Sequence, residues 1–384
     1  MTLPHTADMV VIGGGVMGAS TAYHLARRGV KNVLLLEKEQ FYGQGATGRC
    51  AGGVRYQFST EINVRLSQLS LPMLESFEEE IGQPIDYRQC GYLILLSNEE
   101  DLTQYEMNVR LQNELGVDTT IMDGEEIRQR LPMMNLEDIL AGTFNAKDGL
   151  VDPNSVVMGY INAATRLGVK TLSGVEVTGI DLQGGEIASV ITSQGTVQTP
   201  ILINTAGPWA GRIGHMAGVE IPITPLRRQI LTTTPLPEIP ADFPFVIDFA
   251  QSLYFHREGE GLLTGMSNPY QTPGFNQDID PEWEVNHLEA AAQRMPLLEN
   301  AGLLSHWAGL YENTPDAHPI FGATPVAGFY ICAGFSGHGF MHGPASGLIM
   351  SEIILDGEPS SLDVSELGLD RFESGRLIRE YNVI

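Results

Sequence analysis

The N-terminal part of the chain holds the pattern that most restricts its fold. Residues 9–12 (MVVI) are apolar and lead into Gly13, Gly15 and Gly18, after which a helix-forming segment ends at Gly29. A second apolar run ends at Glu37. Glycines between a strand and a helix let the backbone approach a pyrophosphate, and an acid about 20 residues further on can bind ribose hydroxyls. The pattern therefore predicts a βαβ unit that binds a dinucleotide, although it does not separate NAD from FAD.

Length and charge narrow the function further. With 384 residues the chain is long enough for two domains. Its net charge of −25 would repel nucleic acid and anionic lipid, so we expect neither as a partner. The three cysteines are far apart without a CxxC pair, and the chain shows no signal peptide and no apolar run long enough to span a membrane. We expect a cytoplasmic protein with no metal site and no membrane insertion.

The order of the apolar runs predicts a discontinuous architecture. Residues 201–205 and 329–333 read as further buried strands, residues 175–199 as a hairpin, and residues 61–82 as a helical stretch interrupted by Pro72. The fold class is therefore α/β, with a Rossmann-like dinucleotide-binding domain built from residues 1–84, 145–218 and 318–384. A β-rich α+β substrate domain, residues 85–144 and 219–317, would be inserted into it.

Four segments together resemble the D-amino-acid oxidase superfamily of FAD oxidoreductases. They are VVIGGGVMGASTAYHLARRG, GATGRCAGGVRYQF, LINTAGPWA and AGFSGHGFMHGPASG. The sequence looks closest to sarcosine oxidases and to the β subunits of L-proline dehydrogenases. The resemblance implies a bound FAD rather than NAD, and a small amino acid as substrate.

The resemblance also places the cofactor along the chain. The residues that it implies for FAD binding come from the glycine-rich turn, the following acid, the next loop, the hairpin, residues 206–209 and the GHGFM run. They are Gly13, Gly15, Val16, Met17, Gly18, Glu37, Lys38, Ala46, Thr47, Gly48, Arg49, Gly52, Gly53, Val177, Ala206, Gly207, Trp209, Gly337, His338, Gly339, Phe340 and Met341. A helix begins directly after GHGFM, and its N-terminal dipole would favour negative charge on the flavin. His338 can equally be a packed structural histidine.

The resemblance also implies four candidate residues for the substrate side. Arg55, close after the flavin loop, would pair both oxygens of a substrate carboxylate, unless it forms a surface ion pair. Tyr254 and Tyr311 would wall the cavity and orient the amine, and His256 would be a base or a surface residue.

The sequence departs from the monomeric sarcosine oxidases at three positions. Gly309 falls where those enzymes carry the cysteine that links covalently to the flavin, so we expect non-covalent FAD. Met341 and, approximately, Leu263 fall where they carry lysines that hold the carboxylate and assist oxygen reduction. The departures argue against sarcosine as substrate and against oxygen as the preferred electron acceptor.

These observations predict an FAD-dependent dehydrogenase or oxidase that moves a hydride from the carbon beside the amine nitrogen of a small amino acid to flavin N5. L-Proline and sarcosine compete as substrates with primary L-amino acids. One alternative is an electron-transferring β subunit of a multi-subunit amino-acid dehydrogenase; others are a silent flavin-binding protein and an NAD-dependent dehydrogenase. The electron acceptor, a partner subunit and homo-oligomerisation stay open.

Overall fold

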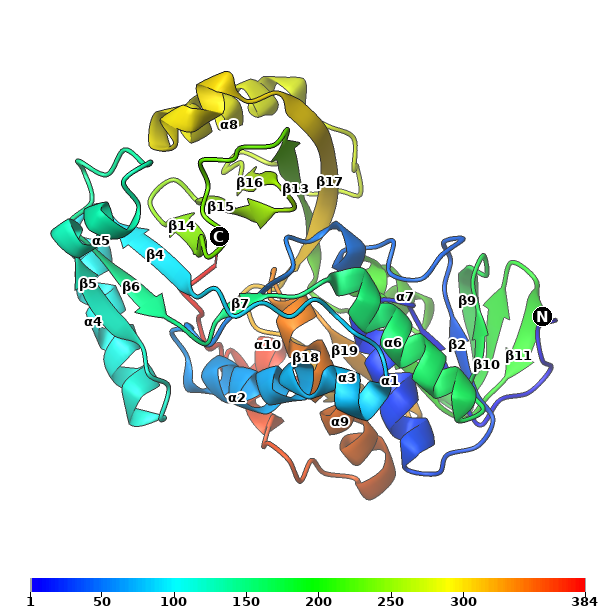
Figure 1. Ribbon diagram of the computed structural model, residues 1–384. Coiled ribbons are helices and arrows are strands. Elements are labelled where there is room, and N and C mark those ends of the chain that lie inside the picture. The colour runs from blue at the N-terminus through cyan, green and yellow to red at the C-terminus, as the bar shows by residue number, and fades with distance from the viewer. Residues whose placement is uncertain (1, 384) are drawn as a thin grey trace.

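The computed structural model describes residues 2–383 and contains two large β-sheets (Figure 1). The first sheet has six strands in the order β18-β19-β12-β1-β2-β8. Its strands are β1 (Met9–Ile12), β2 (Val33–Leu36), β8 (Lys170–Leu172), β12 (Leu202–Asn204), β18 (Ile320–Ala323) and β19 (Phe329–Ala333). All neighbours in it run parallel except β18, which is antiparallel to β19.

Both faces of this sheet are covered, which explains why β1 and β2 are apolar at every position. Val11 and Leu35 pack on one face against α1 (Val16–Arg27), α6 (Pro153–Arg166) and α9 (Gly339–Asp356). Val10 and Leu34 pack on the other face. That face is covered by α7 (Ala210–Met216) and by the antiparallel strands β9 (Val177–Gln183), β10 (Glu186–Thr192) and β11 (Gly195–Gln198). Parallel strands buried in this way read as continuous apolar runs.

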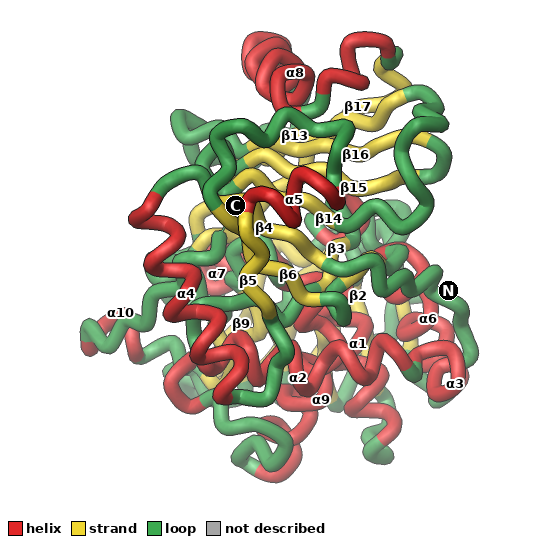
Figure 2. Tube along the Cα trace, turned by 60° about the vertical axis from the view of Figure 1, so that its left-hand side comes forward, coloured by secondary structure: helices red, strands yellow, loops and turns green. Residues whose placement is uncertain are grey.

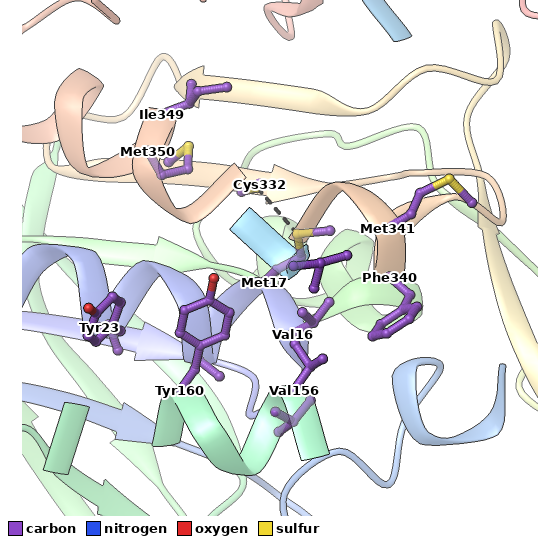
Figure 3. Packing of buried hydrophobic residues seen from close by; sticks show 14 of the residues in the cluster. Val16, Met17, Tyr23, Val156, Tyr160, Cys332, Phe340, Met341, Ile349 and Met350 are labelled. Carbon is purple, nitrogen blue, oxygen red and sulfur yellow. Dashed lines mark hydrogen bonds between the residues drawn. The ribbon is translucent and has the colours of Figure 1, made fainter. Parts of the chain in front are cut away.

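Helices α1 and α9 pack unusually closely because glycines lie between them. A Cβ added at Gly347 would overlap the Ser20 hydroxyl, and one at Gly343 would lie 2.9 Å from Val16 Cγ1. Figure 3 shows the core that the two helices share with α6, in which Met17 contacts Cys332. Because α1 follows β1 and α9 follows β19, both helices begin at the carboxyl edge of the parallel sheet.

The second sheet has eight strands in the order β17-β13-β16-β15-β14-β4-β6-β5 (Figure 2). They are β4 (Tyr92–Leu96), β5 (Thr120–Asp123), β6 (Ala141–Asn145), β13 (Thr224–Thr233), β14 (Phe245–Asp248), β15 (Leu253–Glu258), β16 (Gly261–Met266) and β17 (Leu303–Asn313). Leu93, Val246 and Phe255 face outward and pack with residues of α5 (Gly124–Arg130) and α8 (Pro281–Arg294). Tyr92 and Phe245, at alternate positions, face the cleft.

The other elements are short or connect the two sheets. They are η1 (Thr47–Arg49), β3 (Gly53–Val54), α2 (Glu61–Glu75), α3 (Phe77–Ile81), α4 (Glu99–Glu114), β7 (Gly149–Leu150), η2 (Gly207–Trp209), η3 (Pro296–Asn300), η4 (Ser365–Leu367) and α10 (Arg371–Ser374). Among residues 2–383, no helix combines the length and the apolar character needed to cross a bilayer.

The predicted α/β fold is confirmed, and two local expectations need correction. Residues 175–199 form three strands rather than a two-stranded hairpin, because β11 pairs with β10. Pro72 does not interrupt its helix: α2 continues to Glu75, and the break comes at Ser76. Pro72 lies on the exposed side of α2, where water can replace the backbone hydrogen bond that a proline cannot donate. The strands of the parallel sheet come from the three segments expected to form the nucleotide domain; the domain boundaries stay predictions.

Candidate functional site

A deep cleft lies between the carboxyl edge of the parallel sheet and the inner face of the eight-stranded sheet. Most of the site residues expected from the sequence line it. They are Gly13, Gly15, Val16, Met17, Glu37, Lys38, Ala46, Thr47, Arg49, Gly52, Gly53, Arg55, Val177, Ala206, Gly207, Trp209, Tyr254, Tyr311, Gly337, His338, Gly339, Phe340 and Met341. Gly18, Gly48 and His256 do not line it. The roles given to these residues stay predictions.

The glycine-rich turn after β1 needs its glycines for steric reasons. Gly13 has φ +111°, and a Cβ there would lie 2.5 Å from the Thr205 carbonyl oxygen. A Cβ on Gly18 would overlap the carbonyl oxygen of Gly13, so Gly18 lets helix α1 approach the turn without touching the cleft itself. Gly15 is the N-cap of α1 and offers no side-chain cap. The first N–H groups of α1 are therefore directed toward the cleft with the positive end of the helix dipole.

Glu37 closes the turn from the end of β2. Its Oε2 accepts a hydrogen bond from the Gly14 backbone N–H at 2.6 Å, and its Oε1 accepts one from Glu39 at 2.8 Å. Burial raises the pKa of this carboxyl, and the two backbone hydrogen bonds oppose the rise. The carboxylate is fixed beside the turn, where the sequence pattern places the ribose.

Two stacked aromatic rings, each with a cation over it, lie beside this turn. Lys38 lies 4.1 Å from the centroid of the Trp209 ring, which stacks on Phe275 at 5.7 Å. Arg212 lies 3.6 Å from the Phe275 centroid. Arg212 also lines the cleft, and it places a positive charge at the dinucleotide end.

The loop that carries Arg49 is attached to strand β17. The Arg49 guanidinium donates to the Ala308 carbonyl at 2.8 Å, and the Trp307 indole donates to the Arg49 carbonyl at 3.0 Å. A Cβ on Gly309 would lie 2.9 Å from Arg49 Cβ. The wall of the cleft is therefore too close at Gly309 to accept a side chain.

The GHGFM run forms the start of helix α9 and the floor of the cleft opposite the sheet. His338 is the N-cap of α9 and provides no side-chain cap. Its Nε2 lies 3.2 Å from the Ala317 carbonyl, and its ring packs edge-on against Phe58. Burial lowers the pKa of His338 to about 3, with the Arg55 charge contributing, so the ring is neutral at pH 7. The positive potential at this point comes from the helix N-terminus, not from the imidazole.

Four aromatic rings from the eight-stranded sheet wall the cleft. Tyr92 stacks on Phe245 with centroids 4.2 Å apart, and Phe245 lies 5.5 Å from Tyr254. Tyr311 completes the wall, with its ring against Gly337. Burial raises the pKa of Tyr254 and of Tyr311, so both phenols stay protonated. The expected positions of Tyr254 and Tyr311 in the cleft are found, whereas Tyr92 and Phe245 were not anticipated.

Arg55 and His256 are both held by backbone carbonyls. The two terminal nitrogens of Arg55 donate to the carbonyls of Gln57 and Asn382, and its guanidinium lies 4.3 Å from the Phe58 ring centroid. His256 lies outside the cleft, with its ring centroid 5.1 Å from that of Phe245. Its Nδ1 is within hydrogen-bond distance, 3.0 Å, of the Arg257 carbonyl oxygen. Burial lowers the pKa of His256 to about 4. Arg55 therefore reaches the cleft with much of its donor capacity in use, and His256 does not reach it.

Two further charged residues line the cleft and were not anticipated. Glu312 accepts a hydrogen bond from the Phe335 N–H through Oε1, while its buried Oε2 has no partner among the described residues, and burial raises its pKa to about 7. Arg228 lies on β13 and borders the cleft near Tyr254 and Tyr311. A signal for Arg228 exists in the sequence: Leu226, Arg228 and Ile230 alternate, so the arginine occupies an otherwise apolar strand face.

The cleft fits an extended dinucleotide. Two helices begin at it, and neither has a side-chain cap from its own N-cap residue: α1, whose Val16 N–H lies 3.3 Å from Thr47 Oγ1, could bind a pyrophosphate, and α9 could favour an electron-rich ring. A fixed carboxylate, Glu37, lies where the sequence pattern places the ribose. Comparison with known proteins agrees: residues 8–353 match the family model DAO, described as FAD dependent oxidoreductase. The chain belongs to the DAO family. An FAD cofactor and oxidoreductase chemistry on amines follow from that membership.

The chain is similar to several known members of the DAO family. A crystal structure of L-proline dehydrogenase from P. horikoshii superposes with a TM-score of 0.91 at 34% identity, covering 98% of this chain and 100% of that chain. Mitochondrial dimethylglycine dehydrogenase of Rattus norvegicus is 32% identical over 95% of this chain, and mitochondrial sarcosine dehydrogenase of Mus musculus 31% over 98%. The chain spans 45% and 43% of those two proteins, less than half of their length. The resemblance stated from the sequence is confirmed.

Proposed function

We propose that this protein is an FAD-dependent dehydrogenase that oxidises the carbon–nitrogen bond of a small amino acid, with L-proline and sarcosine as the leading candidates. The observation that carries the proposal is that an aromatic wall and the start of α9 line the same cleft. With FAD bound in this cleft, Tyr92, Phe245, Tyr254 and Tyr311 would enclose the substrate. The structural similarity to the L-proline dehydrogenase of P. horikoshii supports the same class of substrate.

Bound FAD supplies the hydride acceptor, flavin N5. Gly13, Gly15 and Glu37 would hold its ADP half, and Thr47 and Arg49, which line the same cleft, would hold the part between that half and the flavin. The N-terminus of α9 would stabilise negative charge on the flavin without a proton transfer, because the adjacent His338 is neutral.

The chain's own contribution to the reaction is position and exclusion of water. The amine must be uncharged so that its lone pair can form the imine as the hydride leaves, and the apolar rings around it favour that neutral form by desolvation. Protonated phenols of Tyr254 and Tyr311 can donate hydrogen bonds to the substrate. Because the reaction itself needs no general base, the remote position of His256 does not count against it.

We propose that the FAD is bound non-covalently. Gly309 has no room for a side chain toward the cleft, since even a Cβ would press on Arg49. Cys50 is the only cysteine among residues 2–383 that lines the cleft. Burial raises the pKa of the Cys50 thiol to about 12, which keeps it out of the reactive thiolate form at pH 7.

Anaerobic titration of the purified, FAD-loaded chain tests the proposed function. L-Proline, sarcosine, N,N-dimethylglycine, glycine and L-alanine are added separately, and the visible flavin band is followed. A secondary amino acid should bleach the band without any partner protein, and turnover with an artificial dye should exceed turnover with oxygen. If none of the five bleaches the band, the proposal is wrong; bleaching only after a partner subunit is added would support the alternative of an electron-transferring subunit.

A further inference from the structure

Arg228 carries a charge that has no counterion in the described part of the chain. Its Nη1 donates to the Arg227 carbonyl at 3.1 Å, and its Nε is buried without a partner. Arg228 is half-buried, and two more deeply buried arginines are paired: Arg294 with Asp138 and Asp248, and Arg371 with Asp316. Within residues 2–383, no carboxylate lies within salt-bridge distance of Arg228.

The contrast with the neighbouring residue is informative. Arg227 projects to the opposite side of β13 and pairs with Asp280 at 2.9 Å. The whole chain carries 47 acidic side chains against 22 basic ones. An acidic protein that places no carboxylate beside a desolvated guanidinium leaves that charge available for an anion from outside.

Arg228 lies where such an anion would enter. In the β13–β17 register it lies opposite Gly309, which has no side chain to cover it. Its guanidinium is 4.9 Å from the centroid of the Tyr311 ring, and Tyr254 is close enough for the two groups to influence each other's charge. Burial lowers the pKa of Arg228, but a guanidinium stays protonated at neutral pH. Arg228, Tyr254 and Tyr311 all line the cleft.

Arg55, the anchor expected from the sequence, is less available. Both of its terminal nitrogens already donate to backbone carbonyls, of Gln57 and of Asn382. To bind a carboxylate with both nitrogens, Arg55 would have to release these contacts. An unpaired guanidinium, by contrast, gains a partner without losing one, and bidentate pairing with a carboxylate suits its planar geometry.

We propose that Arg228, with the hydroxyls of Tyr254 and Tyr311, binds the carboxylate of the amino-acid substrate, and that Arg55 instead fixes the C-terminal segment beside the cleft. The inference rests on the proposed function only for the identity of the bound molecule as an amino acid. It places the carboxylate against the eight-stranded sheet, so the amine-bearing carbon is directed toward the flavin.

The test uses a carboxylate that cannot be oxidised. Tetrahydro-2-furoate, a proline analogue with oxygen in place of nitrogen, is titrated into the FAD-loaded protein, and the shift of the visible flavin spectrum gives its Kd. Its neutral primary amide is titrated in parallel. Wild type, Arg228→Gln, Arg228→Lys, Arg55→Gln and the matched control Arg227→Gln are compared, each after its FAD content and melting temperature have been measured.

Arg228→Gln should raise the Kd for tetrahydro-2-furoate on the order of 100-fold, because truncating one partner of a buried charge pair is costly. The Kd of the amide should change little. For tetrahydro-2-furoate, the Kd of Arg228→Lys should lie between those of wild type and Arg228→Gln, and the Kd of Arg227→Gln should match that of wild type. Loss of furoate binding in Arg55→Gln but not in Arg228→Gln would overturn the inference, as would a wild-type protein that does not respond to furoate. Since no oxidation is involved, a failure of the proposed function would show in the amino-acid titration and not here.

Discussion

Gly53, at the start of β3, packs against Tyr92 and Phe245 of the aromatic wall, and a single methyl group there should be costly. A Cβ on Gly53 would overlap the Tyr92 hydroxyl, and it would lie 2.9 Å from Tyr92 Cζ and 3.1 Å from Phe245 Cε2. Carbon atoms in comfortable contact are separated by about 3.5 Å or more. Tyr92 cannot yield easily, because it is 3% exposed and stacked on Phe245. We expect Gly53→Ala to lower the free energy of unfolding by about 2 kcal/mol, within the usual range for overpacking.

A double-mutant cycle assigns the cost to the hydroxyl. Tyr92→Phe removes the overlapping oxygen, so Gly53→Ala/Tyr92→Phe should recover about 1 kcal/mol of the loss as coupling. Gly45→Ala is the matched control: Gly45 also lines the cleft, but its Cβ would meet nothing nearer than the Trp209 ring at 3.9 Å. Urea unfolding of the FAD-free and FAD-saturated proteins measures all four variants. A Gly53→Ala protein as stable as Gly45→Ala, or a cycle without coupling, would refute the reasoning.

Three further predictions concern the cofactor and the pH dependence. Gly15→Asp should abolish FAD binding while leaving the far-ultraviolet circular dichroism unchanged, because its carboxylate would take the pyrophosphate position at the start of α1; a yellow purified variant would contradict this. Acid precipitation should release all flavin from wild type and from Cys50→Ser alike, and flavin retained in either pellet would show a covalent bond. Burial lowers the pKa of His287 from 6.5 to about 4. As the pH falls, His287 is therefore protonated near pH 6.5 in the unfolded chain but only near pH 4 in the folded protein. The protein should therefore lose about 2 kcal/mol through this group between pH 7 and pH 5, and His287→Gln should show a correspondingly flatter dependence in urea unfolding; identical slopes would count against the assignment.

The cofactor half of the cleft was readable from the sequence because its signals are local. Gly13, Gly15 and Glu37 act within a single βαβ unit, and their spacing along the chain determines their spacing in space. The buried parallel strands could likewise be recognised as continuous apolar runs. Strand β11 was missed because it is short and mostly exposed, so its sequence carries little periodic signal.

The substrate half could not be read in the same way. Tyr92, Arg228 and Phe245 come from three strands whose pairing order, β13-β16-β15-β14-β4, is unrelated to their order in the chain. No local pattern states that these side chains share one face. Arg55, on the other hand, stands out in the sequence because it follows closely after the loop at residues 46–49 that the resemblance assigns to the cofactor. Its hydrogen bonds to the carbonyls of Gln57 and Asn382 could not be predicted, because Asn382 is far away in the sequence.

The glycine contacts between α1 and α9 have a consequence for how the cofactor is tuned. Each helix presents its N-terminus to a different end of the same molecule, and Gly343 and Gly347 determine how far apart those two ends are. The environment of a bound flavin would thus depend partly on the absence of side chains at Gly343 and Gly347, about one and two turns inside α9, at positions that do not line the cleft.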